Sequence, residues 1–188
     1  KSQNLAESVI ANSFKVNFTK ILELKNKTAF VSYPQNLPRF DIKELKIYTQ
    51  NGYLIKNLKP KKLNLSKNFT LQRNGGVKTI VSIENKKLAL ISSNASGCFY
   101  ASVNNIETSE EIFRTKCLPE QAKNNDFNGL GSSNVHLNES ILLTLGTPEK
   151  HASKNSKLAQ KNESKFGKIL KINKKNLIKK ISDKNFEL

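Results

Sequence analysis

The sequence predicts an all-β protein, a β-propeller-like fragment of about two and a half four-stranded antiparallel blades. Three segments carry the prediction, because each has a short apolar strand, a turn of Lys, Asn, Glu or Ser, and a second, more apolar strand. These segments are residues 21–33, 80–92 and 134–146. Apolar runs between polar turns are typical of antiparallel hairpins. Their recurrence at intervals of about 50–60 residues is typical of propeller blades or other arrays.

Further strands follow each segment and extend it toward the four-stranded unit of a propeller blade. The first segment is followed by a hairpin around Asn51-Gly52, a dipeptide that favours a type I′ turn. The second is followed by two strand-like runs within residues 97–117, and the third by one strand at residues 166–172. The predicted blades are therefore residues 19–60, 76–118 and 132–172, after a lead-in segment of residues 1–18.

The same pattern also fits a β-sandwich or an irregular meander. Residues 173–188 are predicted as a basic C-terminal tail or a truncated blade. Leu177, Ile178, Ile181 and Phe186 recur at near-helical spacing, which indicates a short amphipathic helix, and an unfinished outer strand is the alternative. Because the sequence begins at Lys and contains no Met, we expect a fragment or a processed product.

The net charge of +17 suggests an anionic partner. Of the 32 basic residues only Arg39, Arg73 and Arg114 are arginine, so the bidentate groups that favour phosphate and base edges are scarce. We therefore expect no specific nucleic-acid binding. No apolar run approaches the roughly twenty residues that span a bilayer, so no transmembrane segment is expected in this stretch.

Two cysteines, Cys98 and Cys117, begin and end the second hairpin of the second unit. A turn centred between Glu107 and Thr108 places the cysteines opposite each other, at a distance that a disulfide accepts. A disulfide predicts an oxidising compartment, either the periplasm or the cell exterior. One form of this prediction has the protein anchored there by a missing N-terminal segment. Two reduced thiols in a cytosolic protein are the alternative.

Candidates for catalysis are few. His136 alternates with apolar residues in a predicted strand, and His151 lies in the polar loop after Gly146. Either could act as a general base only with an orienting partner and a cleft, and packed or exposed histidines are the commoner roles. Two cysteines and two distant histidines give no metal-ligand spacing, so no metal site is expected.

Residues 128–172 resemble the soluble glucose/sorbosone dehydrogenase family of quinoprotein-type propellers, which act on aldose sugars. The run from Gly129 to Gly146, then Ala-Gln, then Gly-Lys-Ile-Leu follows the family's spacing. The matching positions are Gly146, Ala159, Gln160, Gly167, Lys168, Ile169, Leu170 and Ile172. The resemblance implies a six-bladed propeller and, where it extends to function, pyrroloquinoline quinone and calcium as cofactors.

Several family features are absent from this sequence. Leu130 or Gly131 occupies the place of the family's general-base histidine, and His136 comes several residues later. Thr147 stands where an acidic residue is expected, and few arginines are present to hold a quinone carboxylate. The resemblance therefore implies a relative without a complete catalytic set in this stretch.

The leading prediction is an exported propeller domain, related to sugar dehydrogenases, that acts as a ligand-binding or scaffold module. Ser132, Ser133, Lys157 and Gln160 are the predicted ligand-binding residues, with a sugar or an anionic polysaccharide as partner. One alternative is a quinone-dependent aldose oxidoreductase whose catalytic residues lie partly outside the sequence. The other is a basic protein that binds polyanions.

Overall fold

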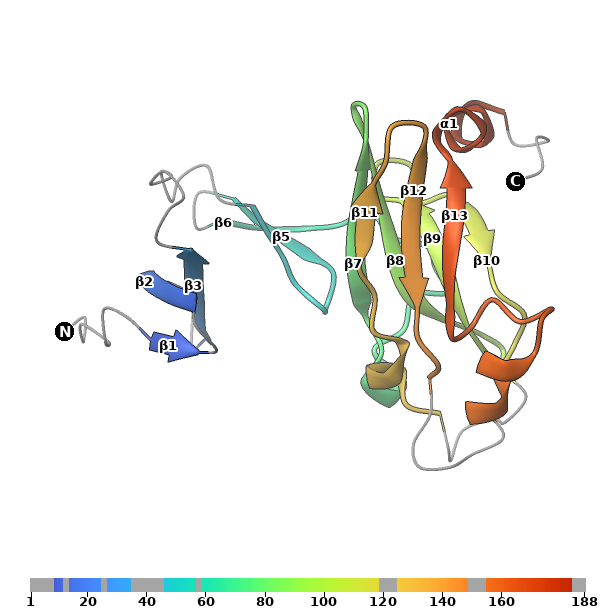
Figure 1. Ribbon diagram of the computed structural model, residues 1–188, viewed down its shortest axis with the longest axis horizontal. Helices are drawn as coiled ribbons and strands as arrows, with labels where there is room; N and C mark the ends of the chain where they lie inside the picture. Colours follow the sequence, from blue (N-terminus) through green and yellow to red (C-terminus); the bar gives the residue numbers. More distant parts are fainter. Residues whose placement is uncertain are drawn as a thin grey trace. The chain divides into compact units, whose positions relative to one another are not determined.

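A computed structural model describes residues 9–11, 14–24, 27–34, 46–56, 59–118, 125–148 and 155–183, the first three ranges by their backbone alone (Figure 1). Within these residues the chain forms antiparallel sheets and one α-helix, so the all-β prediction is confirmed. The chain divides into two compact units, residues 1–47 with 55–61 and residues 48–54 with 62–188.

The first unit contains a three-stranded sheet in the order β1-β2-β3. Its strands are β1 (Val9–Ala11), β2 (Phe14–Leu24) and β3 (Lys27–Pro34). Strands β2 and β3 form the hairpin predicted for residues 21–33, with Leu24 opposite Lys27 at its turn. The lead-in segment is extended where it is described, because β1 pairs with β2.

The first predicted blade, residues 19–60, is not one four-stranded sheet. Its second part forms a separate sheet in the order β4-β5-β6. The strands are β4 (Lys46–Tyr48), β5 (Tyr53–Lys56) and β6 (Lys59–Lys62). Two prolines, Pro34 and Pro38, separate the two hairpins in the sequence, and proline cannot donate to a strand ladder. Strand β2 instead has β1 as its second partner.

The turn between β4 and β5 also differs from the predicted type I′ turn. Gly52 N–H donates to the Thr49 carbonyl at 3.0 Å, and Thr49 N–H donates to the Tyr53 carbonyl at 2.8 Å. Gly52 has a φ of +83°, whereas Asn51 keeps a negative φ. A type I′ turn requires positive φ at both central residues. The loop is therefore one in which a single glycine takes the left-handed conformation.

The second unit contains the four-stranded antiparallel sheet predicted for residues 76–118, in the order β10-β9-β8-β7. Its strands are β7 (Val77–Ile83), β8 (Lys86–Ala95), β9 (Cys98–Asn105) and β10 (Glu111–Arg114). Each strand is joined to the next by a short turn, as in a meander. Glu84 and Ser96 have positive φ in the first two of these turns, and Gly97 follows Ser96 with the same sign.

The third predicted blade forms a sheet of three strands, in the order β11-β12-β13. These strands are β11 (Asn134–His136), β12 (Ser140–Leu145) and β13 (Lys168–Asn173). Helix α1 (Lys174–Ser182) follows β13 directly, which confirms the helical alternative for this part of the tail. Asn173 caps the helix, because its side chain accepts a hydrogen bond from the Asn176 amide at 3.1 Å.

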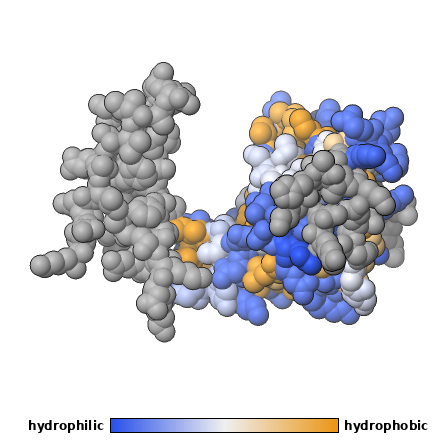
Figure 2. Space-filling model, turned by 90° about the horizontal axis from the view of Figure 1, so that it is seen from below, coloured by the Kyte–Doolittle hydropathy of each residue, from blue (hydrophilic) through white to orange (hydrophobic). Residues whose placement is uncertain are grey.

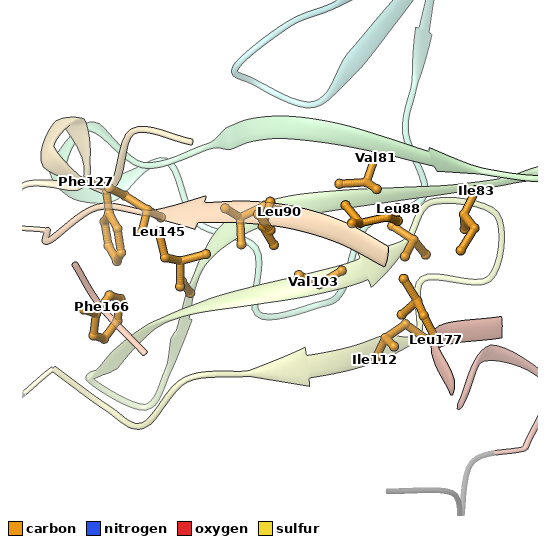
Figure 3. Packing of buried hydrophobic residues seen from close by; sticks show 14 of the residues in the cluster. Val81, Ile83, Leu88, Leu90, Val103, Ile112, Phe127, Leu145, Phe166 and Leu177 are labelled. Atoms are coloured by element: carbon orange, nitrogen blue, oxygen red, sulfur yellow. The ribbon is translucent and has the colours of Figure 1, made fainter. Parts of the chain in front are cut away.

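The two sheets of the second unit pack face to face around one apolar core (Figures 1 and 3). Leu88, Leu90 and Val103 extend from the four-stranded sheet toward the other layer, and Phe127, Leu145 and Phe166 lie together near one end (Figure 3). Leu177 of α1 lies beside Ile112 at the opposite end (Figure 3). Alternate residues of a strand point to opposite faces, so Leu88 and Leu90 of β8 belong to this core, whereas Ala89 and Ile91 belong to a second, smaller cluster.

Candidate functional site

A pocket of about 400 Å³ lies between the two sheets of the second unit. Most of its lining is apolar and comes from both layers and from α1. The lining residues are Val81, Leu88, Val103, Ile112, Phe113, Ile141, Leu143, Lys165, Ile169, Leu170, Lys171, Ile172, Asn173, Asn176 and Leu177. Ligand pockets commonly measure about 300–1,000 Å³ and are lined mainly by apolar side chains with a few polar groups. This pocket has both properties.

The polar groups of the pocket lie at its rim. Lys165 and Lys171 are exposed, and no described residue accepts a hydrogen bond or pairs with either ammonium group. Asn173 and Asn176, by contrast, are joined in the cap of α1. An entering ligand therefore meets apolar walls inside and two positive charges at the opening.

A second hollow, of about 380 Å³, lies beside the first and shares Lys165 with it. Its lining includes Leu158, Phe166 and Cys117, together with four basic residues and one acid. The charged residues are Arg114, Lys116, Lys161, Lys165 and Glu163. The Arg114 guanidinium lies 3.6 Å from Glu111 and 5.7 Å from the centre of the Tyr100 ring, so it has partners already. The remaining lysines make the surroundings of both openings basic.

The predicted disulfide is present. Cys98 and Cys117 are joined, with 5.3 Å between their Cα atoms. Asn104 lies opposite Glu111, in the predicted register, and a bulge between Glu111 and Phe113 then shifts the pairing by one residue. The disulfide therefore closes the hairpin of β9 and β10 next to the second hollow.

The four predicted ligand-binding residues have separate places in the second unit. The Ser132 hydroxyl donates to the Thr144 carbonyl at 2.7 Å, and the Ser133 amide donates to the Thr144 hydroxyl at 2.8 Å. These two serines thus join the start of β11 to the end of β12. Lys157 and Gln160 are exposed on the short 3₁₀ helix of Ser156–Gln160. None of the four lines the pocket between the sheets.

The two histidines offer no catalytic geometry in the described part of the chain. His136 is exposed in β11, opposite Ile141. His151 lies outside the described residues. Among the described residues, no group of three or more His, Cys, Asp or Glu side chains is placed to hold a metal ion. Nor does any helix in the described ranges have the length and hydropathy to span a membrane.

Several of the residues that match the family pattern lie near the end of β12 and the start of β13, where backbone segments approach closely. The Lys168 ammonium donates to the Ala159 carbonyl at 2.5 Å. Gly167 has a φ of +67°, and a Cβ there would lie 2.4 Å from the Ala159 Cβ. At Gly146 a Cβ would lie 2.1 Å from the Gly129 carbonyl oxygen. These positions therefore have a structural role, which is close packing of backbone segments.

We expect Gly146→Ala to lower the free energy of unfolding by about 1–3 kcal/mol, because the added methyl overpacks a backbone contact. Gly129→Ala is the matched control, since Gly129 is exposed in the 3₁₀ helix of Phe127–Leu130 and has no positive φ. Urea unfolding followed by circular dichroism measures both. Equal midpoints for the two variants would show that the close approach at Gly146 is relieved at little cost.

Sequence reasoning missed the pocket. The alternation of Leu170 and Ile172 with exposed residues in β13 was a signal for a one-sided strand. It did not show which strand of the other sheet would face β13.

Figure 2, which views the molecule from below, shows described surface that is mostly hydrophilic with a few apolar patches, consistent with the basic composition.

Comparisons with models of protein families, with curated proteins and with solved structures find no match to this chain.

Proposed function

We propose that the chain is an exported ligand-binding module whose binding site is the apolar pocket between its two packed sheets. The observation that carries this proposal is the pocket itself, with about 400 Å³ of space between walls of Val, Leu, Ile and Phe. Well-packed cores leave few voids larger than a water molecule. This pocket opens to solvent and is lined mainly by apolar side chains, as ligand sites commonly are, so we infer that it holds a bound group.

The ligand of this pocket is apolar where it enters the core. Each buried CH₂ group contributes about 0.8 kcal/mol on transfer from water, so a ligand that fills the apolar walls can bind without specific polar contacts inside. The two lysines at the rim, Lys165 and Lys171, favour a negative or hydrogen-bond-accepting group at the opening.

Export is supported by the disulfide. A bridge between Cys98 and Cys117 persists in oxidising compartments and is rare in the cytosol. The chain is therefore proposed to work in the periplasm or outside the cell. Titration of thiols in the native protein tests this, and two reactive thiols without reductant would contradict it.

Filling the pocket with an indole should abolish ligand binding. We expect Ile172→Trp to weaken binding of the neutral dye Nile red about tenfold or more, because Ile172 lines the pocket and is packed against the core. Val135→Trp is the matched control, since Val135 is in β11 of the same sheet, is 56% exposed and does not line the pocket. Dye fluorescence measures both. Equal affinities would place the dye elsewhere and contradict the assignment of the site.

Binding of polyanions is a second candidate, favoured by the net charge of +17 and by the lysines around both openings. Neutralisation of phosphate or sulfate groups releases counterions, so the logarithm of the affinity would fall linearly with the logarithm of the salt concentration. Heparin retention at increasing salt tests this candidate. Elution of the protein from heparin at low salt, unchanged when Lys165 and Lys171 are replaced by alanine, would contradict polyanion binding.

A relationship with the sugar dehydrogenases, with the sheets as propeller blades, is a further proposal. It is supported by the spacing of Gly146, Ala159, Gly167 and Lys168 in the sequence, and by the face-to-face packing of two consecutive sheets, which neighbouring propeller blades also have. Reconstitution with pyrroloquinoline quinone and calcium, followed by aldose-dependent dye reduction, tests it. Absence of dye reduction in the reconstituted protein would remove the enzymatic version.

A further inference from the structure

Strand β13 forms one edge of its sheet. The sheet has the order β11-β12-β13, and no strand in the described part of the chain pairs with the outer side of β13. The opposing sheet has four strands, and its last strand, β10, lies on the same side of the two layers as β13 (Figure 1). The three-stranded layer therefore lacks a strand opposite β10.

The hydrogen-bond register shows which backbone groups of β13 point to this open side. Lys174 N–H donates to the Glu139 carbonyl at 2.9 Å. Hydrogen-bonded pairs alternate along an antiparallel ladder, so Ile172 and Leu170 also bond with β12. The amides and carbonyls of Ile169 and Lys171 consequently point away from β12.

A bond on the other side of β12 gives the same alternation independently. Thr144 N–H donates to the Ser133 carbonyl at 3.0 Å, so the backbone of Thr144 faces β11. Ile169, the residue opposite Thr144 in β13, is therefore not bonded to it and faces outward. Ile169 and Lys171 both line the pocket. The pocket thus runs along a row of peptide groups that are available for pairing.

An edge of unpaired peptide groups beside an apolar pocket suits an extended peptide. An added strand would bond to Ile169 and Lys171 through its backbone and direct every second side chain toward Ile112 and Phe113. A compact apolar molecule would use the apolar walls but leave the backbone row unused. The geometry thus favours a strand over other ligands.

The charge of the chain favours an acidic partner over a second copy. Two chains that each carry +17 repel one another, so a second copy is disfavoured at a rim that already carries Lys165 and Lys171. A peptide with acidic residues between its apolar ones would place carboxylates beside these lysines.

We propose that the ligand of this pocket is an extended peptide segment of a partner protein, with alternating apolar and acidic residues, which adds to β13 as the fourth strand of its sheet. This inference rests on the proposed binding function of the pocket and identifies the class of ligand.

The test uses the full chain and a fluorescein-labelled heptapeptide in which valine alternates with glutamate. We expect a saturable rise in fluorescence anisotropy at low salt. Lys171→Pro removes an outward N–H group without removing a bond to β12, and edge strands tolerate proline. It should weaken peptide binding about tenfold more than Lys171→Ala, which removes the same charge but keeps the amide.

Two further peptides with the same side chains carry N-methyl groups on either the odd or the even amides. At least one should bind about tenfold less tightly, because it loses the donors that face β13. The urea midpoint of Lys171→Pro is measured in parallel and should match that of Lys171→Ala, which shows that the fold is intact.

The outcomes separate this inference from the proposed function. Dye binding without peptide binding would overturn the inference and leave the pocket as a site for small apolar molecules. Absence of both would overturn both proposals. Strand addition would be excluded if both methylated peptides bound as tightly as the unmethylated one and if Lys171→Pro bound the peptide as tightly as Lys171→Ala. A dimer in sedimentation experiments that Lys171→Pro dissociates would make a second copy the occupant and overturn the acidic partner.

Discussion

Leu90→Ala is expected to lower the free energy of unfolding of the second unit by about 2–5 kcal/mol, the usual cost of removing a buried leucine side chain beyond Cβ. Leu90 lies in β8, an inner strand of the four-stranded sheet, and is 0% exposed. It points into the core that the two sheets share (Figure 3). The loss therefore weakens the contact between layers as well as one strand.

The matched control is Leu137→Ala, the same chemical change at a residue that is 44% exposed after β11. It should shift the urea midpoint by a small fraction of the change at Leu90, since little apolar area is lost. Far-UV circular dichroism in urea measures both variants. Similar midpoints would mean that the sheets do not share a core, and the assignment of a pocket between them would fail with it.

Loss of the disulfide is expected to lower the free energy of unfolding by about 3 kcal/mol, from the loss of a constraint on the unfolded chain. The bridge joins residues separated by 19 positions. The loop it closes contains all of β9 and β10, and β10 is an edge strand of its sheet. The variant that tests this carries Cys98→Ala and Cys117→Ala together.

Reductant provides the internal control. Dithiothreitol should destabilise the native protein by about the same amount as the double substitution, and it should leave the double variant unchanged. Thermal unfolding of the native protein and of the double variant, each with and without dithiothreitol, compares the four conditions. An unchanged midpoint for the reduced native protein would show that local pairing, such as the Leu118 amide with the Phe99 carbonyl at 2.7 Å, holds the hairpin without the bridge.

Local features of the fold were predictable because they depend on neighbours in sequence. The hairpins at residues 80–92 and 134–146 follow from polar turns between apolar strands. The Cys98–Cys117 bridge was predicted from the register at the turn, and it forms although a bulge shifts the pairing by one residue before the cysteines. The helical tail was one of two alternatives, and the spacing of Leu177, Ile178 and Ile181 indicated the correct one.

Partners distant in sequence were not predictable in the same way. The first predicted blade failed because β2 pairs with β1 as well as β3, and nothing in either strand's alternation specifies its second neighbour. The pocket was missed for a related reason. Ile112 and Ile172 lie some sixty positions apart, and their common site depends on how two sheets face each other, which side-chain periodicity leaves undetermined.

The exposed edge of β13 has a consequence for storage and expression as well as for recognition. An unpaired apolar strand is a template for uncontrolled growth into fibrils, and natural sequences suppress this with charged residues along the strand. Lys168, Lys171 and Lys174 are spaced along and just beyond β13 in this way. Shielding their charges with concentrated salt should therefore promote precipitation, so dilute buffers would keep the protein monodisperse.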